Sequence, residues 1–297
     1  MRVTRSSILA VILFVSMSAC LDHDVVDTGV QLTEDVATID AYILEHGLNA
    51  YKDKSGIRFV IDELGKDGVP PRGDQTIKAK YTGKFLDGTV FDDGGDGADG
   101  PLGSFIGGWQ YCLSIWPQGT KGKLFVPSPL GFGAKTVNNV PANSILMFDI
   151  DFTEVTLSNA EKARLTSDVQ TIDDWLEENE IDAVKDSTGV RYVITSPGGG
   201  AVPGLYTRVK FSAVGKAFST GNQFFTGTSE PTNVFDSRPA DYIGGLKVAL
   251  THLPEGGKMT VYIPSGLAFG PFDNTQINLP ANTIVVYEIE LLEIYDN

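Results

Sequence analysis

Apolar residues recur at helical spacing in two segments that lie far apart in the chain. These positions are Val36, Ile39 and Ile43 in the first segment, and Val169, Ile172 and Leu176 in the second. Because residues three or four apart share one face of an α-helix, each segment is predicted to form an amphipathic helix. Ser158 and Glu161 have the S-x-x-E spacing of a capping box, which predicts where the second helix begins.

Each predicted helix is followed by short segments in which apolar and polar residues alternate. In the first half of the chain the alternating apolar positions are Ile57, Phe59 and Ile61, and later Leu146, Phe148, Ile150 and Phe152. Such alternation places the apolar side chains on one face of a strand. Between these strands lies one short amphipathic helix per half, with apolar positions Trp109, Cys112, Leu113 and Trp116, and Leu246, Ala249, Leu250 and Leu253. An antiparallel sheet closed by one short helix would bury both stripes, which predicts an α+β fold.

The two halves are copies of one domain. "DVATIDAYILEHGLNAYKDKSGIRFVIDELG" starts at Asp35 and "DVQTIDDWLEENEIDAVKDSTGVRYVITSPG" starts at Asp168. "FVPSPLGFG" at 125–133 returns as "YIPSGLAFG" at 262–270, and "VPANSILMFDIDFTEV" at 140–155 returns as "LPANTIVVYEIELLEI" at 279–294. The period is too long for a solenoid, so we expect two domains, each preceded by its own helix, at 33–156 and 157–297.

Composition narrows the class of function. The chain has 297 residues, is 42% apolar and carries a formal charge of −15. A chain of this length and apolar content can form two domains that each bury a core. Its negative charge would repel the phosphate backbone of a nucleic acid, so nucleic-acid binding is not expected. After Cys20, Cys112 is the only cysteine, and the three histidines are scattered, so we predict no metal site and no cofactor. Cys112 is interpreted as a small buried apolar residue.

The N-terminus has the pattern of an export signal. Arg2 and Arg5 precede an apolar run that is too short to span a membrane and is followed by small residues. The tetrad "MSAC" resembles the bacterial lipobox, which implies a signal at 1–19, lipidation of Cys20 and a polar tether at 20–32. Leu21 stands where some bacteria place a retention Asp, so the outer membrane of the cell envelope is favoured. The alternative is cleavage near Ala19 that leaves Cys20 a plain thiol.

The stretch "YTGKFLDGTVFDDG" at 81–94 carries the most specific motif. Together with "FIGGW", "VPSPLGFG" and "VPANSILMFDIDF", it resembles the FKBP family of peptidyl-prolyl isomerases over about residues 55–156. Residues 188–295 resemble the family in outline. The resemblance implies a curved five-stranded antiparallel sheet around a short helix, proline-containing polypeptide clients, and binding of macrolide-type inhibitors.

The chemistry implied by this resemblance needs no nucleophile. Rotation about a prolyl bond faces a barrier of ~18–20 kcal/mol because amide resonance is lost, and a dry aromatic pocket that prefers the twisted amide lowers it. The resemblance implies that Trp109 forms the floor of the pocket and that Asp92 is the pocket acid, which accepts a hydrogen bond, for example from Tyr81. It also implies that the backbone N–H of Ile106 donates to a carbonyl of the bound peptide. The pocket residues carried over are Tyr81, Phe91, Asp92, Phe105, Ile106, Trp109, Phe132, Val140 and Phe148. The alternative is that these aromatic residues only fill a core.

The sequence departs from the family at several of these positions. Phe132 and Phe269 stand where the family usually has a tyrosine that bonds the substrate carbonyl, and Gly100 replaces another pocket aromatic. The second copy is expected to line its pocket with Phe211, Phe224, Tyr242, Ile243, Leu246, Phe269, Leu279 and Tyr287, where Phe211 stands for Tyr81. Leu246 replaces the tryptophan and Phe225 replaces the acid, so this copy is predicted to bind with weak or no catalysis. "VFDSR" at 234–238 offers a competing Phe-Asp pair that lies too close to Tyr242.

The glycine-rich segment at 95–100 suggests two other kinds of site. "GDGADG" satisfies a dinucleotide-binding pattern, but Pro101 follows instead of a helix and its two Asp residues would repel a pyrophosphate. "GGDGADGPL" resembles a single calcium-binding nonapeptide turn, which cannot stack alone. We therefore expect a flexible loop here. Two functions remain open: an envelope prolyl isomerase acting mainly through the first domain, and a non-catalytic chaperone or scaffold that binds proline-bearing segments.

Overall fold

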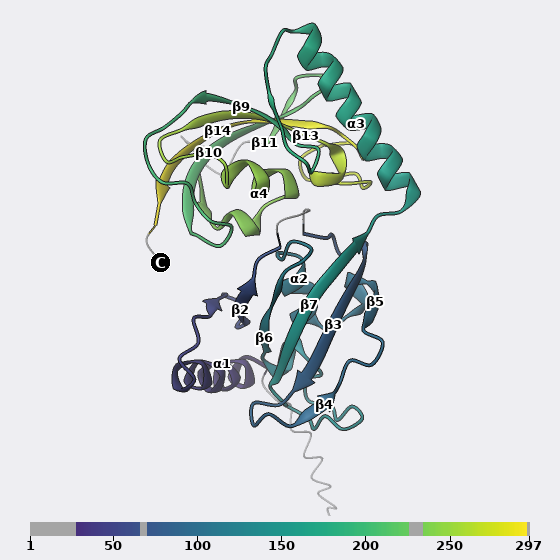
Figure 1. Cartoon of the computed structure of the whole chain (residues 1–297), viewed down its shortest axis with the longest axis vertical. Helices are drawn as coiled ribbons and strands as arrows, with labels where there is room; N and C mark the ends of the chain where they lie inside the picture. Colours follow the sequence, from purple (N-terminus) through teal and green to yellow (C-terminus); the bar gives the residue numbers. More distant parts are fainter. Residues whose placement is uncertain (1–27, 66–69, 226–233, 296–297) are drawn as a thin grey trace, which may run out of the picture.

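Two α+β domains follow one another in the chain. The computed structural model describes residues 28–65, 70–225 and 234–295, and the expected signal at 1–19 and Cys20 lie outside this range. Figure 1 shows the two sheets one above the other, with helix α4 on the side of the second sheet that faces the first domain. None of the helices in the described residues has the length and apolar character needed to span a bilayer.

The described residues of the first domain form two α-helices, two 3₁₀ helices and seven strands. In chain order its elements are α1 Thr28–Glu45, β1 Tyr51–Lys52, β2 Arg58–Glu63, β3 Thr76–Lys84, β4 Val90–Asp92, β5 Ala98–Pro101, η1 Leu102–Ser104, α2 Gly107–Leu113, β6 Lys121–Val126, η2 Ser128–Leu130 and β7 Leu146–Thr156. The strand order is β1-β2-β6-β7-β3-β4, with β5 also paired to β3, and the strand pairs are antiparallel. The sheet implied by the family resemblance had five strands, so the short strands extend it at its edges.

The second domain repeats this plan. Its elements are α3 Asn159–Glu178, β8 Val184–Lys185, β9 Arg191–Ser196, β10 Val209–Ala217, β11 Gln223–Phe225, β12 Val234–Ser237, η3 Pro239–Asp241, α4 Gly244–Leu250, β13 Lys258–Ile263, η4 Ser265–Leu267 and β14 Val285–Ile294. The order β11-β10-β14-β13-β9-β8, with β12 paired to β10, is the counterpart of the first sheet. The predicted α+β fold and its internal repeat are confirmed.

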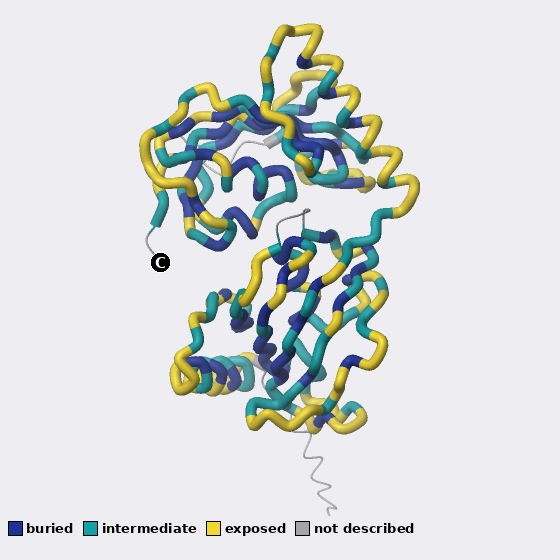
Figure 2. Tube along the Cα trace, in the orientation of Figure 1, coloured by how far each residue is buried: buried dark blue, intermediate teal, exposed yellow. Residues whose placement is uncertain are grey.

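Glycine lets the short helix of each domain lie close to its sheet. A Cβ atom on Gly108 of α2 would come within 2.6 Å of the Val126 side chain on β6, and one on Gly245 of α4 would come within 2.3 Å of Ile263 on β13. Figure 2 shows the buried residues along the middle of both sheets and on these helices. Both helices end before the last apolar residue of their predicted stripes, since α2 ends at Leu113 and α4 at Leu250. Trp116 and Leu253 follow outside the helices and are still fully buried.

The leading helix of each copy is fastened to the domain that follows it. Asp35 on α1 is buried and accepts hydrogen bonds from the backbone N–H and the hydroxyl of Ser128, at 2.7 and 2.6 Å. Asp168 on α3 makes the same two bonds with Ser265. The predicted capping box at Ser158 is present. Helix α1 begins at Thr28, so the expectation that the tether continues to residue 32 was wrong for its last residues.

The glycine-rich segment is more ordered than predicted. Ala98–Pro101 forms strand β5, in which Gly100 lies opposite Ile77 on β3. Gly94, Gly95 and Gly97 have positive φ, a backbone conformation that glycine adopts without strain. The expectation of a flexible loop throughout 95–100 was therefore wrong for its second half.

The two domains share a packed interface. The Tyr206 ring belongs to the core cluster of the first domain, 4.8 Å from the ring of Tyr51 and 5.2 Å from that of Phe59. Arg238 of the second domain pairs with Asp53 of the first at 2.6 Å. On the other side of the interface, Arg72 pairs with Glu161 at 2.8 Å.

Candidate active site

Trp109 lies at the centre of a cluster of aromatic rings in the first domain. Its indole is 3% exposed and sits on α2, where it meets Tyr81 edge to face at 5.0 Å and Phe148 edge to face at 5.5 Å. Phe105 stacks on it at 5.4 Å and 24°. The indole Nε1 is buried and has no hydrogen-bond partner among the described residues. The indole is therefore buried in a ring cluster in which Tyr81 and Phe105 are partly exposed and Phe148 is buried.

The register of β3 and β7 sets the positions of the other rings. Tyr81 and Gly83 follow each other on one face of β3, and Gly83 lies opposite Phe148 on β7. Phe91 on β4 meets Phe148 edge to face at 5.8 Å. The two rings lie over Gly83, which has no side chain to displace them. A Cβ atom on Gly83 would lie 2.6 Å from the Phe91 ring and 3.2 Å from Phe148. Glycine is needed here because the two rings occupy the space above the strand.

Asp92 and Tyr81 form the polar edge of this cluster. The Tyr81 hydroxyl donates to Oδ2 of Asp92 at 2.7 Å, as predicted, and the N–H of Gly94 donates to Oδ1 at 3.0 Å. Burial and the hydrogen bond to Asp92 raise the pKa of Tyr81 to about 12. The phenol therefore stays protonated at neutral pH and fixes the orientation of the carboxylate.

The remaining predicted residues lie around the same cluster. Ile106 is the N-cap of α2, at the end of the helix from which Trp109 projects. Val140 is 4% exposed, and the half-buried Phe132 packs against the same core. Phe85, which the sequence did not single out, also contacts Phe91, at 5.1 Å. The structure thus brings the nine predicted first-domain residues together. Gly100 lies near Phe105, as a Cβ atom there would be 3.9 Å from that ring.

The second domain has an apolar counterpart without these features. Phe224 meets Phe269 at 5.9 Å and Tyr287 at 5.8 Å, both edge to face, and all three pack on the core cluster that contains Leu246 and Leu279. Tyr242 lies next to Ile243, the N-cap of α4. Gly215 lies opposite both Phe225 and Tyr287, as Gly83 lies opposite Asp92 and Phe148. The predicted correspondence of Phe224 and Phe225 to Phe91 and Asp92 is confirmed by this register.

The predicted correspondence of Phe211 to Tyr81 was wrong. Gly215 corresponds to Gly83, and the residue two positions earlier is Ala213 in the second domain and Tyr81 in the first. Ala213 lies opposite Ile289, as Tyr81 lies opposite Ile150. Phe211 is two positions earlier again and therefore corresponds to Ala79. Phe211 is fully buried and stacks on Phe235 at 5.0 Å, and it meets Tyr242 edge to face. The second pocket therefore lacks the tyrosine as well as the tryptophan and the acid.

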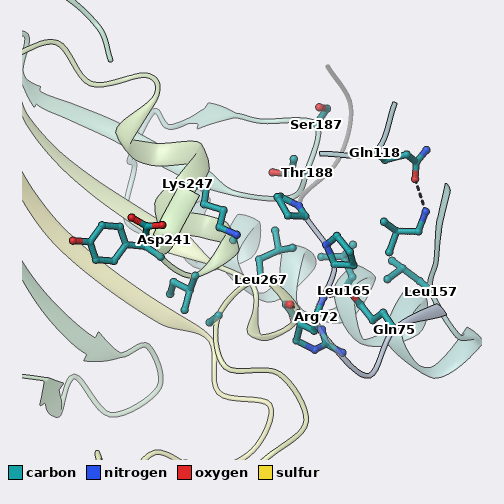
Figure 3. A pocket seen from close by; sticks show the side chains of 18 residues that line it. Arg72, Gln75, Gln118, Leu157, Leu165, Ser187, Thr188, Asp241, Lys247 and Leu267 are labelled. Carbon is teal, nitrogen blue, oxygen red and sulfur yellow. Dashed lines mark hydrogen bonds between the residues drawn. The ribbon is translucent and has the colours of Figure 1, made fainter. Parts of the chain in front are cut away.

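A cavity of about 550 Å³ lies between the domains, and the predicted second-domain pocket residues Tyr242 and Ile243 are part of its lining. Figure 3 shows its lining, in which Arg72 and Gln118 of the first domain lie across from Lys247 and Leu267 of the second. None of the nine first-domain site residues lines it. Apart from Tyr242 and Ile243, sequence patterns did not reveal this lining, because its residues follow no shared periodicity.

No group of three or more His, Cys, Asp or Glu residues in the described part of the chain could hold a metal ion. Cys112 is fully buried and free, as its apolar interpretation predicted. Burial raises the pKa of its thiol well above the usual value, so it is a poor nucleophile.

Comparisons with known proteins match both domains. The profile of the FKBP-type peptidyl-prolyl cis-trans isomerase family matches residues 68–153 and 200–292. FkpA, an FKBP-type peptidyl-prolyl cis-trans isomerase of Aeromonas hydrophila, is 37% identical over 101 residues, which are 33% of this chain and 37% of that protein. An FKBP-type 22 kDa peptidyl-prolyl cis-trans isomerase of Escherichia coli K12 is 32% identical over 126 residues, 41% of this chain and 60% of that protein. Outer membrane protein MIP of Legionella longbeachae is 33% identical over 105 residues, 34% of this chain and 45% of that protein.

The aligned regions cover 37%, 60% and 45% of the lengths of these three curated relatives. The family profile, in contrast, covers more than half of this chain in two separate regions, one on each sheet. The chain belongs to the FKBP-type peptidyl-prolyl cis-trans isomerase family and contains two regions of that type.

Proposed function

We propose that the chain is a peptidyl-prolyl cis-trans isomerase whose catalysis takes place mainly in the first domain. The observation that carries this proposal is the buried Trp109 indole under the rings of Tyr81, Phe105 and Phe148, with Asp92 bonded to Tyr81 at one edge. Relatives named as FKBP-type isomerases support the same activity.

In this proposal the proline ring packs on the Trp109 indole and the aromatic walls exclude water. The planar cis and trans amides are both stabilised by resonance, which is lost as the bond twists. A site that packs better against the twisted form lowers the barrier by differential binding, and each ~1.4 kcal/mol is about tenfold in rate. The backbone N–H of Ile106 holds a substrate carbonyl, and the Asp92–Tyr81 pair supplies polarity at the pocket edge.

The second domain is proposed to bind apolar, proline-bearing segments with little catalysis. Leu246 stands at the position of the indole, and Ala213 stands where the first domain has Tyr81. The rival proposal is that the chain is a non-catalytic chaperone or scaffold. Phe132 favours it, because phenylalanine has no hydroxyl to donate to the substrate carbonyl.

We place the domain boundary between Thr156 and Leu157, where β7 ends shortly before α3 begins.

For location, we propose lipid anchoring through Cys20 in the cell envelope, with the outer membrane favoured. The lipobox-like "MSAC" after an apolar signal supports this, and so does the similarity to a relative named outer membrane protein MIP. The clients are then exported polypeptides that contain proline, and macrolide-type ligands would compete for the first pocket. Labelling of cells with radioactive palmitate tests the anchor: the wild-type chain takes up label and Cys20→Ser does not. Equal labelling of both would rule the anchor out.

A refolding assay tests the isomerase. Residues 21–297 are added to a substrate protein whose refolding is limited by prolyl isomerisation, and the wild type is expected to accelerate the slow phase. Trp109→Leu should remove at least ~90% of the acceleration, because most of the pocket floor is lost. Trp175→Leu, which changes a tryptophan on α3 in the second domain, should leave the acceleration intact. No acceleration by the wild type favours the non-catalytic alternative.

A further inference from the structure

Helix α2 needs support from outside its own turns. It spans only Gly107–Leu113 and starts with two glycines, so its intrinsic stability is low. The carbonyls of Gln110 to Leu113 are bonded within the segment itself, by Ser114, Ile115 and Trp116, so the carbonyls that outside donors reach are the next two, of Ser114 and Ile115. Trp109 projects from α2, and Ile106 caps it, so any movement of this helix moves the floor of the proposed pocket.

The second domain supplies hydrogen-bond donors to the C-terminal end of α2. The ammonium group of Lys247 donates to the carbonyl of Ser114, the C-cap, at 3.0 Å. The hydroxyl of Tyr206 donates to the carbonyl of the next residue, Ile115, at 3.1 Å. The guanidinium group of Arg238 donates to the hydroxyl of Tyr111, within the helix, at 3.2 Å. Three side chains from separate parts of the second domain thus meet on one short helix.

Two of the three side chains are buried, and one of these two carries a charge. Tyr206 is 5% exposed and Lys247 is 8% exposed. Burial lowers the pKa of Lys247 to about 8, and the charge of nearby Asp241 opposes that shift. Burying an ammonium ion costs free energy, which the Ser114 carbonyl and the negative end of the α2 dipole partly offset. Figure 3 shows Lys247 leaving α4 at the edge of the interdomain cavity.

The support runs in one direction between the two copies. Gln110 occupies the place in α2 that Lys247 occupies in α4, and it donates to Gly103 and Phe105 within its own domain. Both helices also close on their own C-caps: the hydroxyl of Ser114 donates to the carbonyl of Tyr111, and the hydroxyl of Thr251 donates to the carbonyls of Lys247 and Val248. The two copies therefore differ in the donors that cross the interface. The copy with the less complete pocket therefore holds the helix of the copy with the more complete one.

We propose that the second domain positions the isomerase site of the first, by fixing the C-terminal end of α2 through Tyr206, Lys247 and Arg238. This inference rests on the proposed isomerase function. The three side chains do not touch the substrate; they set the orientation of Trp109 and of the Ile106 N–H. Loss of their bonds lets α2 rock on the sheet, and the pocket then selects the twisted amide less well.

The test uses Tyr206→Phe and Lys247→Met in residues 21–297, each of which removes one bond and keeps most of the side chain. The matched controls are Tyr262→Phe, a tyrosine of the second domain that is also 5% exposed, and Lys258→Met, a lysine on the exposed part of β13. Isomerisation of a prolyl peptide gives kcat/KM. Fluorine NMR of protein labelled with 5-fluorotryptophan gives the environment of Trp109, whose signal is assigned by its loss in Trp109→Phe.

Each interface variant is expected to lower kcat/KM about threefold to fivefold, and the double variant about tenfold or more. The Trp109 signal should shift or broaden in these variants while the signal of Trp175 stays in place, and both controls should match the wild type. Retention of wild-type kcat/KM, or a Trp109 signal that does not change, overturns the proposal. If the wild type has no activity, the proposed function fails by itself, and an unchanged Trp109 signal would then refute the positioning independently.

Discussion

Replacement of Asp53 by asparagine should destabilise the protein through the domain interface. The side chain of Asp53 is 2% exposed and pairs with Arg238 at 2.6 Å. It also accepts a hydrogen bond from Tyr111, and another from the N–H of Ser55 at 2.8 Å. Asparagine keeps the shape of the side chain but removes its charge and turns one acceptor oxygen into an NH2 donor, so the variant loses the ion pair and part of the hydrogen bonds.

The magnitude follows from the pKa of Asp53. Burial by itself would raise this pKa, but the bonds from Tyr111, Ser55 and Arg238 outweigh burial and lower it to about 2. Because one pKa unit is ~1.4 kcal/mol, a fall from 3.8 to about 2 corresponds to ~2.5 kcal/mol of stability at neutral pH. The folded-state pKa lies below the unfolded one, so this stability is present above about pH 4 and is lost as the pH falls towards 2.

Urea denaturation followed by circular dichroism measures the effect. At pH 7 the free energy of unfolding of Asp53→Asn should be about 2–3 kcal/mol below wild type, since Arg238 keeps its second partner Asp241. The difference should shrink between pH 4 and pH 2. Asp40→Asn, which breaks the pair with Arg58 inside the first domain at a more exposed site, should cost less. A loss under ~0.5 kcal/mol, or one no larger than in Asp40→Asn, would refute the reasoning.

Three further outcomes follow from the structure. Phe132→Tyr should raise kcat/KM up to about fivefold by restoring a bond of ~1 kcal/mol to the substrate carbonyl; no gain in the peptide assay would show that Phe132 is misplaced in the account. Gly83→Ala should cut activity severalfold because its Cβ would lie 2.6 Å from the Phe91 ring. Gly215→Ala, whose Cβ would lie 2.8 Å from Phe224, should leave activity unchanged, and equal losses would contradict catalysis in the first domain. Asp168→Ala should lower the free energy of unfolding by about 2–3 kcal/mol, since it leaves the buried N–H of Ser265 without its partner, and exposed Asp174→Ala is the control; matching urea midpoints would count against this role.

The sequence predicted the parts of the structure that local patterns encode. The repeat, the leading helices and the short helix of each domain follow from periodicity, and the cluster around Trp109 follows from motifs in family order. The error at Phe211 arose because an aromatic residue was matched with an aromatic residue. Gly83 and Gly215 are better reference positions for aligning the two copies, since each must lie beneath two rings.

Contacts between the domains could not be read from the sequence. Tyr206, Arg238 and Asp53 belong to three different segments, and only the folded arrangement brings them together. A half-buried arginine in a loop, such as Arg238, has the same sequence signature as an exposed one. The extended form of residues 98–101 escaped notice for a related reason: its partner strand, not its Gly-Asp composition, holds it in the sheet.

The most direct measurement of the central claim is the cis–trans exchange rate of a short prolyl peptide, followed by NMR exchange spectroscopy with a small amount of protein. Phe91→Ala and Phe224→Ala change corresponding rings of the two domains. Catalysis at the Trp109 cluster predicts rapid exchange with wild type and with Phe224→Ala, and exchange near the uncatalysed rate with Phe91→Ala, provided that circular dichroism shows both variants folded. Full exchange with Phe91→Ala, or its loss with Phe224→Ala alone, would contradict catalysis at the Trp109 cluster.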